Sequence, residues 1–412
     1  MSKLLLLFVA LFFGIQGIAQ QKPLIDYPLP DPLETPKGDR ITSVKEWEDE
    51  QRPWLLSQLE KLMYGYSPEA PKNLKFVVFE QDSMALDGTA VRKQVAIYLE
   101  NDQHLLDLLI YLPRESKKPA PVFLGLNFEG NHTIHNDPAI RLSAEWVWIG
   151  AAGSLKNHPT EHSRGTQSSR WPVELILANG FGVATVYAGD LDPDYHDDFK
   201  NGIHRLYPEL QGRGDNFSTM GAWAWGLSRC MDYFVTDPGI DAEQIAVIGF
   251  SRMGKAAIWA GVKDKRFAMV VSNESGGGGA ALSKRMVGET IAKLNNGNPH
   301  WFCENFKRFN ENEIALPFDQ HTVLSLIAPR LIYVASAEED LGADPLGEFL
   351  GLKYTSDVFA LYGKEGLLDQ EFPKINQPIT TGVMGYHIRF GNHDITEFDW
   401  QQYLNFAREN LK

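Results

Sequence analysis

The stretch IAVIGFSRMGKAAIWAG, residues 245–261, combines a candidate nucleophile with the elements that would position it. An apolar run ends at Gly249, Ser251 follows two residues later, and a helical pattern begins directly after it. A tight strand-to-helix turn lifts a serine hydroxyl out of the sheet, and it requires a small residue such as Gly249 two positions before the serine. The usual second glycine is displaced by one position, to Gly254. The alanines of KAAIWAG favour close packing of a helix on the sheet, so Ser251 is a candidate nucleophile.

A serine nucleophile needs a general base, and the base needs a carboxylate to orient it. In α/β-hydrolases the chain order is serine, acid, histidine. His393 lies in FGNHDITEFDW, a short turn between a strand-like run and a terminal helix, and is the candidate base. Two acids compete: Asp340 follows the run RLIYVAS, and Glu274 ends the run FAMVVSN before four glycines that we expect to open onto a cleft. The residues alone do not choose between these carboxylates.

Strand-like runs and helical segments must position these groups. In the second half of the chain, continuous apolar runs alternate with helical patterns such as residues 219–235. Apolar runs without polar alternation predict a mostly parallel sheet that is covered on both faces. The predicted strands are 75–80, 92–100, 105–113, 121–128, 181–188, 244–250, 266–274 and 330–340. The predicted fold class is α/β, an α/β-hydrolase fold: a three-layer αβα sandwich with a twisted central sheet, forming one catalytic domain over residues 71–412.

The first 70 residues divide into two segments. MSKLLLLFVALFFGIQGIAQQ has a lysine, a short apolar stretch and the small residues Gly17 and Ala19 of a cleavage site, which predicts a signal peptide over residues 1–19. The chain is therefore expected to be secreted or periplasmic, with no membrane span. Residues 20–70 are predicted to form an N-terminal extension. Its helix begins after the capping residue Ser43, is interrupted by Pro53, and ends near residue 65.

Composition argues against several other functions. Asp and Glu outnumber Lys and Arg by 53 to 39, which is unfavourable for a nucleic-acid partner. Cys230 and Cys303 have no zinc-site spacing, and the sequence leaves open whether they pair. His132 and His135 lack a third ligand, and the acidic stretch 190–198 lacks the calcium-loop spacing, so we interpret that stretch as a solvated loop. No metal and no cofactor are expected.

Five motifs occur together in this chain: LGLNFEGNHT, RGTQSSRWPVE, the elbow GFSRMGK, SNESGGGGAA and YHIRFGNHD. Together they resemble the glucuronoyl esterases, carbohydrate esterase family fifteen, from about residue 70 to the C-terminus. The resemblance implies that Ser251 is the nucleophile and that His393 is the general base and later the acid. Glu274 matches the usual acid position of the family. Asp340 matches an alternative position, so we expect Glu274 to orient the imidazole with Asp340 assisting or substituting.

The resemblance also implies binding roles. Arg252 matches an oxyanion-stabilising arginine, and a charged donor in a partly dry site stabilises an oxyanion more than a neutral amide does. A surface role explains Arg252 less well, because the first turn of a helix is unfavourable for a cation. Lys255 matches a lysine that hydrogen-bonds sugar hydroxyls. Glu289 resembles a second sugar-contacting position, and Trp301 is expected in the same pocket wall.

Two departures from the family pattern concern the pocket. Members commonly have a tryptophan shortly after the second acid position, where this chain has Gly342, and fungal members have a cysteine where this chain has Phe250. The implied function is a monomeric serine esterase that cleaves the ester between (4-O-methyl-)glucuronic acid of glucuronoxylan and a lignin alcohol. Because Gly342 replaces that tryptophan, an acetyl-xylan esterase or a general carboxylesterase remains an alternative function. A hydrolase fold retained only to bind glycans is a further alternative, which the intact Ser251 and His393 argue against.

Overall fold

The computed structural model describes residues 27–99, 103–116 and 118–411 of the 412-residue chain. The signal peptide expected over residues 1–19 therefore lies outside the described residues. Within the described ranges, no helix has the length and apolar character needed to cross a membrane.

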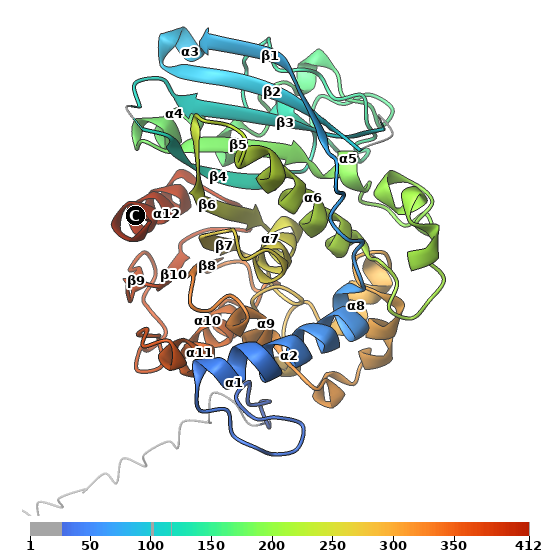
Figure 1. Ribbon diagram of the computed structural model, residues 1–412, viewed down its shortest axis with the longest axis vertical. Helices are drawn as coiled ribbons and strands as arrows, with labels where there is room; N and C mark the ends of the chain where they lie inside the picture. Colours follow the sequence, from blue (N-terminus) through green and yellow to red (C-terminus); the bar gives the residue numbers. More distant parts are fainter. Residues whose placement is uncertain (1–26, 100–102, 117, 412) are drawn as a thin grey trace, which may run out of the picture.

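Ten strands form one mixed sheet in the order β1-β2-β3-β5-β4-β6-β7-β8-β10-β9 (Figure 1). The six central strands from β5 to β10 run parallel, whereas β1, β2, β3 and β9 join antiparallel at the two edges. The bounds are β1 Lys75–Met84, β2 Ala90–Tyr98, β3 His104–Pro113, β4 Ala120–Asn127, β5 Gly182–Tyr187, β6 Ile240–Phe250, β7 Met269–Asn273, β8 Leu331–Ala337, β9 Ile379–Thr380 and β10 Met384–Arg389. The predicted mostly parallel sheet is confirmed.

Helices cover both faces of this sheet, as the α/β-hydrolase prediction requires (Figure 1). Strand β6 shows why its run is continuously apolar: Ile245 and Val247 enter the core on one face, while Ala246 and Ile248 enter the core on the other. The first face packs against α6 (Thr219–Phe234), α7 (Arg252–Lys263), α9 (Gln320–Ser325) and α10 (Pro345–Lys353). The second packs against α4 (Val173–Ala178) and α12 (Glu397–Asn410). Shorter helices are α3 Ala85–Gly88, α5 Ala188–Leu191, α8 Ile291–Gly297 and α11 Ser356–Leu361.

The N-terminal segment is part of the core. Its helix begins at the predicted Ser43 capping box and continues through α1 (Val44–Glu46), a π-helical turn at Trp47–Gln51, α2 (Arg52–Leu59) and a second π-helical turn at Glu60–Tyr64. The expected interruption at Pro53 is wrong, because this proline lies in the first turn of α2, where its missing N–H is tolerated. The Tyr64 ring stacks on Trp259 of α7 with centroids 4.0 Å apart. Hydrophobic burial thus ties the segment to the helix that follows Ser251.

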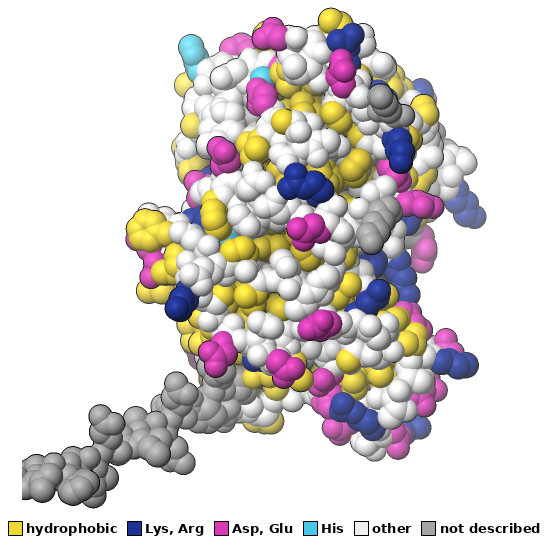
Figure 2. All heavy atoms as spheres, turned by 90° about the vertical axis from the view of Figure 1, so that its left-hand side faces the viewer, with side chains coloured by type: hydrophobic (Ala, Val, Ile, Leu, Met, Phe, Trp, Pro, Cys, Tyr) yellow, Lys and Arg dark blue, Asp and Glu magenta, His cyan; other side chains and the backbone are white. Residues whose placement is uncertain are grey.

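The two cysteines left open by the sequence are both buried and free. Cys230 lies on α6, whereas Cys303 lies in the segment after α8. The fold is therefore held by its core without a disulfide between them. Figure 2 shows acidic and basic side chains interspersed over one face of the molecule.

Candidate active site

Ser251 occupies a strained turn between β6 and α7. Its backbone angles are φ 56° and ψ −132°, a conformation that side chains rarely adopt. A Cβ at Gly249 would lie 2.0 Å from the Met253 carbonyl oxygen, so this turn excludes any other residue there. The Ser251 N–H donates to the Asn273 carbonyl of β7 at 2.9 Å, which fixes the turn on the sheet. Its hydroxyl does not cap α7 and has no hydrogen-bond partner among the described residues, a common state before substrate binds.

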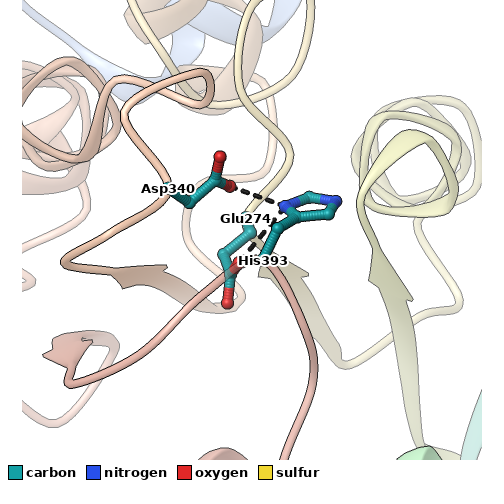
Figure 3. A group of neighbouring side chains, drawn as sticks. All are labelled: Glu274, Asp340 and His393. Atoms are coloured by element: carbon teal, nitrogen blue, oxygen red, sulfur yellow. Dashed lines mark hydrogen bonds and ion pairs between the residues drawn. The ribbon is translucent and has the colours of Figure 1, made fainter.

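His393 and two carboxylates meet at the edge of the sheet (Figure 3). Glu274, Asp340 and His393 follow β7, β8 and β10, three neighbouring parallel strands whose carboxyl ends share that edge. His393 Nδ1 lies 2.6 Å from Asp340 Oδ2 and 3.2 Å from Glu274 Oε2. The structure therefore brings together the predicted base and both predicted acids, and gives Asp340 the shorter contact.

The charges of this group differ by environment. Burial opposes a charged imidazole, but the hydrogen bonds and charges of the two carboxylates outweigh it and raise the pKa of His393 to about 9. Burial raises the pKa of Glu274 to about 7, against the hydrogen bond from His393 and the charge of Arg389. Burial also acts on Asp340, yet its hydrogen bond with His393 keeps the pKa of Asp340 below its ordinary value. Asp340 is consequently the better electrostatic partner for an imidazolium.

Arg389, which the sequence analysis missed, connects Glu274 to the histidine turn. Its NH2 group donates to Glu274 Oε1 at 2.6 Å and also to the carbonyls of Asn392 and Asp394, which flank His393. The side chain of Glu274 is fully buried and also accepts from the Asp394 N–H. Glu274 thus helps to hold the turn that carries the imidazole. The available signal was an arginine at the end of the buried strand β10, in YHIRF.

Arg252 is held by Asp194, a second residue that the sequence analysis missed. Arg252 Nε lies 2.5 Å from Asp194 Oδ2, and the guanidinium lies 4.9 Å from the centre of the Phe128 ring. Asp194 Oδ1 accepts from Trp301 Nε1 at 2.8 Å and contacts His300 Nε2 at 3.1 Å. Burial opposes this ionised carboxylate, but these partners keep the pKa of Asp194 below its ordinary value. The predicted solvated loop over 190–198 is wrong at Asp194, because its partners come from distant segments.

Lys255, Glu289 and Trp301 also lie together. Lys255 is buried, and its Nζ donates to Glu289 Oε2 at 2.7 Å and to the Ser275 carbonyl at 2.5 Å. The ammonium lies 5.7 Å from the centre of the Trp301 ring. The glycine run does not open onto a cleft as expected: it is buried, and a Cβ at Gly277 would lie 2.1 Å from the Glu289 carbonyl oxygen. The glycines instead permit the close packing that brings Glu289 to Lys255.

Two groups of side chains have the chemistry of metal ligands. His132 and His135 do not face a common ion, because they bind Ser163 at 2.7 Å and Glu174 at 2.9 Å. The ligand atoms of Glu274, Asp340 and His393 lie within 4.8 Å of one another, a spacing that could hold an ion. Both carboxylates already contact the same imidazole nitrogen, so the group is chemically better suited to orient a base.

A serine elbow after the central strand of such a sheet, with an imidazole turn after a late strand, defines the α/β-hydrolase class of esterases. Among known proteins, Carbohydrate esterase MZ0003 from an unknown prokaryotic organism is 45% identical over 392 residues, covering 93% of this chain and 90% of that protein. The family model "Glucuronyl esterase, fungi" matches residues 177–363. The chain belongs to the glucuronoyl esterase family, carbohydrate esterase family 15.

Two solved structures are similar over nearly the whole chain. One is described as a promiscuous CE15 esterase from a marine bacterial metagenome, and the other as a glucuronoyl esterase from Solibacter usitatus. Each is 44% identical with a TM-score of 0.88, and the match covers 94% of this chain and 98% of the other.

Proposed function

We propose that the protein hydrolyses esters of glucuronic acid through an acyl-enzyme. The observation that carries this proposal is the contact of His393 with Asp340 and Glu274, on the sheet edge where the Ser251 turn also lies. Neutral His393 takes the Ser251 proton as the hydroxyl oxygen attacks the ester carbonyl. The departing alcohol takes that proton from the imidazolium. Water, activated by the same imidazole, then attacks the acyl-enzyme and releases the free acid.

Arg252 supplies the positive charge for the tetrahedral oxyanion. Asp194 holds its Nε, and among the described residues no hydrogen bond occupies its terminal nitrogens, which remain available as donors. A preorganised charged donor of this kind is the largest single contribution in many acyl-transfer enzymes. The Lys255–Glu289 pair and Trp301 next to it offer a cation, a carboxylate and a ring, which suits a sugar that carries hydroxyls. The substrate we propose is a glucuronoxylan ester of a lignin alcohol.

Benzyl glucuronate tests the reaction directly. The protein should hydrolyse it at an unchanged rate in EDTA, and Ser251→Ala should lower kcat by at least about 10⁴-fold. A fluorophosphonate probe should label Ser251 in the wild type only, which separates an esterase from a hydrolase fold that only binds glycans. A wild type that resists the probe and leaves the ester intact would overturn the proposal.

A broader carboxylesterase activity is a second candidate. Gly342 stands where family members commonly have a tryptophan, and its neighbour Leu341 is 73% exposed, so this wall of the site is open. One relative of 44% identity is itself described as promiscuous. Acetyl-xylan and 4-nitrophenyl acetate tested beside benzyl glucuronate decide the question. Acetyl esters favoured in kcat/KM would support the second candidate.

Export is proposed from the N-terminal sequence. Expression of the full chain in a bacterium should yield an extracytoplasmic protein whose first residue is Gln20, as determined by N-terminal sequencing. Recovery of the uncleaved chain in the cytoplasm would contradict the signal-peptide assignment.

A further inference from the structure

A second cavity lies on the same sheet edge as Ser251, on the far side of the segment that carries Asp194. It has a volume of about 390 Å³, which is within the range of small-ligand sites. Pro193 and Tyr195 line this cavity, while Asp194 between them contacts Arg252. The wall between the candidate active site and the cavity is therefore one segment thick.

The strand order of the sheet gives the distance between the cavity and the Ser251 turn. Cavity residues follow β5 and begin β3, which lie two and three strands from β6. Adjacent strands are about 4.8 Å apart, so the cavity begins roughly 10–15 Å from the nucleophile turn. Because β3 runs antiparallel to β5, its first residues share the edge with the end of β5, beside α5 (Figure 1). A uronic acid bound near Ser251 would need a chain of a few sugar units to reach the cavity.

The lining of the cavity suits a ligand that is rich in hydroxyl groups. Trp146 and Tyr195 form an edge-to-face pair with centroids 4.7 Å apart, and the Tyr195 hydroxyl accepts from Asn201 Nδ2 at 2.9 Å. The same lining includes the carboxyl group of Asp190 and the guanidinium of Arg205. Burial raises the pKa of Asp190 to about 8, so this carboxyl can donate as well as accept at neutral pH. Aromatic rings beside hydrogen-bonding groups suit a ligand that has both apolar faces and hydroxyl groups, as an uncharged sugar does.

We infer that this cavity is a subsite for the neutral xylan backbone of the substrate, occupied while the uronate ester lies at Ser251. This inference rests on the proposed function. The cavity contributes to binding but not to the bond-breaking step, because among the described residues no hydrogen bond, ion pair or ring contact joins its lining side chains to Ser251, Arg252 or His393.

Two matched substrates test the inference: benzyl glucuronate, and the benzyl ester of a glucuronic acid attached to xylotetraose. For the oligosaccharide ester, Trp146→Ala should raise KM between about two- and tenfold with kcat unchanged. Arg205→Ala should act in the same direction, and its exposed side chain makes misfolding no concern. Neither variant should change kinetics on benzyl glucuronate. Trp148→Ala is the matched control, a half-exposed tryptophan of the same loop that does not line the cavity.

Direct binding separates this inference from the proposed function. Titration of unesterified xylotetraose into Ser251→Ala should give a heat signal, which Trp146→Ala in the same background weakens. If xylotetraose does not bind, and the two esters have equal KM in wild type and both variants, the subsite is refuted while the esterase stands. If benzyl glucuronate is not hydrolysed at all, the proposed function fails, and the titration still reports on the cavity.

Discussion

Asp340 and Glu274 both contact His393, and replacing them one at a time measures what each contributes. Asp340→Asn and Glu274→Gln keep side-chain size, remove the charge and replace one acceptor oxygen by an NH2 donor. Together the carboxylates raise the pKa of His393 from 6.5 to about 9, which corresponds to roughly 10²–10³ in proton affinity. His393 is 43% exposed, so solvent screening reduces the expected effect of the two carboxylates on activity to about 10–100-fold. Most of this effect should come from Asp340, because its carboxylate is ionised and lies closer to His393 Nδ1 than that of Glu274 does.

We therefore expect Asp340→Asn to lower kcat/KM for benzyl glucuronate by about 10–100-fold and Glu274→Gln by less than about tenfold, since one acid remains to orient the base. The double variant should lose about 10⁴-fold, as when an orienting acid is removed completely. The pH profile gives an independent measure. In the proposed mechanism neutral His393 is the base, so activity should rise with pH as the imidazolium loses its proton. Removing a carboxylate lowers the pKa of His393, which moves the acidic limb of the pH–activity profile to lower pH. The shift should be larger for Asp340→Asn than for Glu274→Gln.

The control for this experiment is folding, because Glu274 also bonds Arg389. Thermal unfolding of each variant shows whether an activity loss reflects a displaced histidine turn. The reasoning is refuted if Glu274→Gln, with an unchanged Tm, costs more activity and moves the acidic limb further than Asp340→Asn.

Three further predictions concern the oxyanion donor, the pocket wall and the core. Asp194→Asn should lower kcat about 10–100-fold with little change in KM, and should cost nothing more in an Arg252→Ala background; additive losses in kinetic assays would contradict a shared role. Gly342→Trp should lower KM for benzyl glucuronate but not for acetyl esters, because a Cβ there meets only Asp340 Oδ1, at 3.4 Å; an unchanged KM would contradict this. Tyr64→Ala should destabilise the protein by about 3–5 kcal/mol in chemical unfolding, because it removes the ring stacked on Trp259; a change below about 1 kcal/mol would show that the N-terminal segment is dispensable.

The sheet could be predicted because its signal is local. Runs such as LIYVA and IAVIGF are apolar at every position, and strands buried on both faces require that pattern wherever they lie. The turn at Ser251 is local for the same reason, since Gly249 and the serine lie on one short segment. The prediction at Pro53 was wrong because a proline inside a helix usually ends or kinks it, whereas a proline in the first turn is tolerated. The sequence does not show that a π-helical turn precedes Pro53 and makes it part of the first turn of α2.

The partners of the site could not be predicted because they are set by tertiary contacts. Asp194 lies in DLDPDYHDD, where charge alone does not show which carboxylate is turned inward to meet Arg252, His300 and Trp301. The ranking of Asp340 over Glu274 likewise depends on distance and on Arg389, which the chain places on β10. The family resemblance predicted both acid positions, but a position does not give the hydrogen bonds around it.

The proposed mechanism explains how Arg252 can pair with Asp194 and still stabilise the oxyanion. Attack on the ester creates a positive imidazolium and a negative oxyanion at the same time. In the proposed mechanism each new charge meets a fixed partner of opposite sign, Asp340 for the imidazolium and Arg252 for the oxyanion, so little reorganisation is required. Asp194 lowers the net charge of the resting site but fixes the guanidinium, and a free arginine would lose about 2 kcal/mol of side-chain entropy on ordering. Orientation achieved before the reaction therefore offsets the attraction that Asp194 takes away, which is why losing Asp194 should reduce kcat rather than increase it.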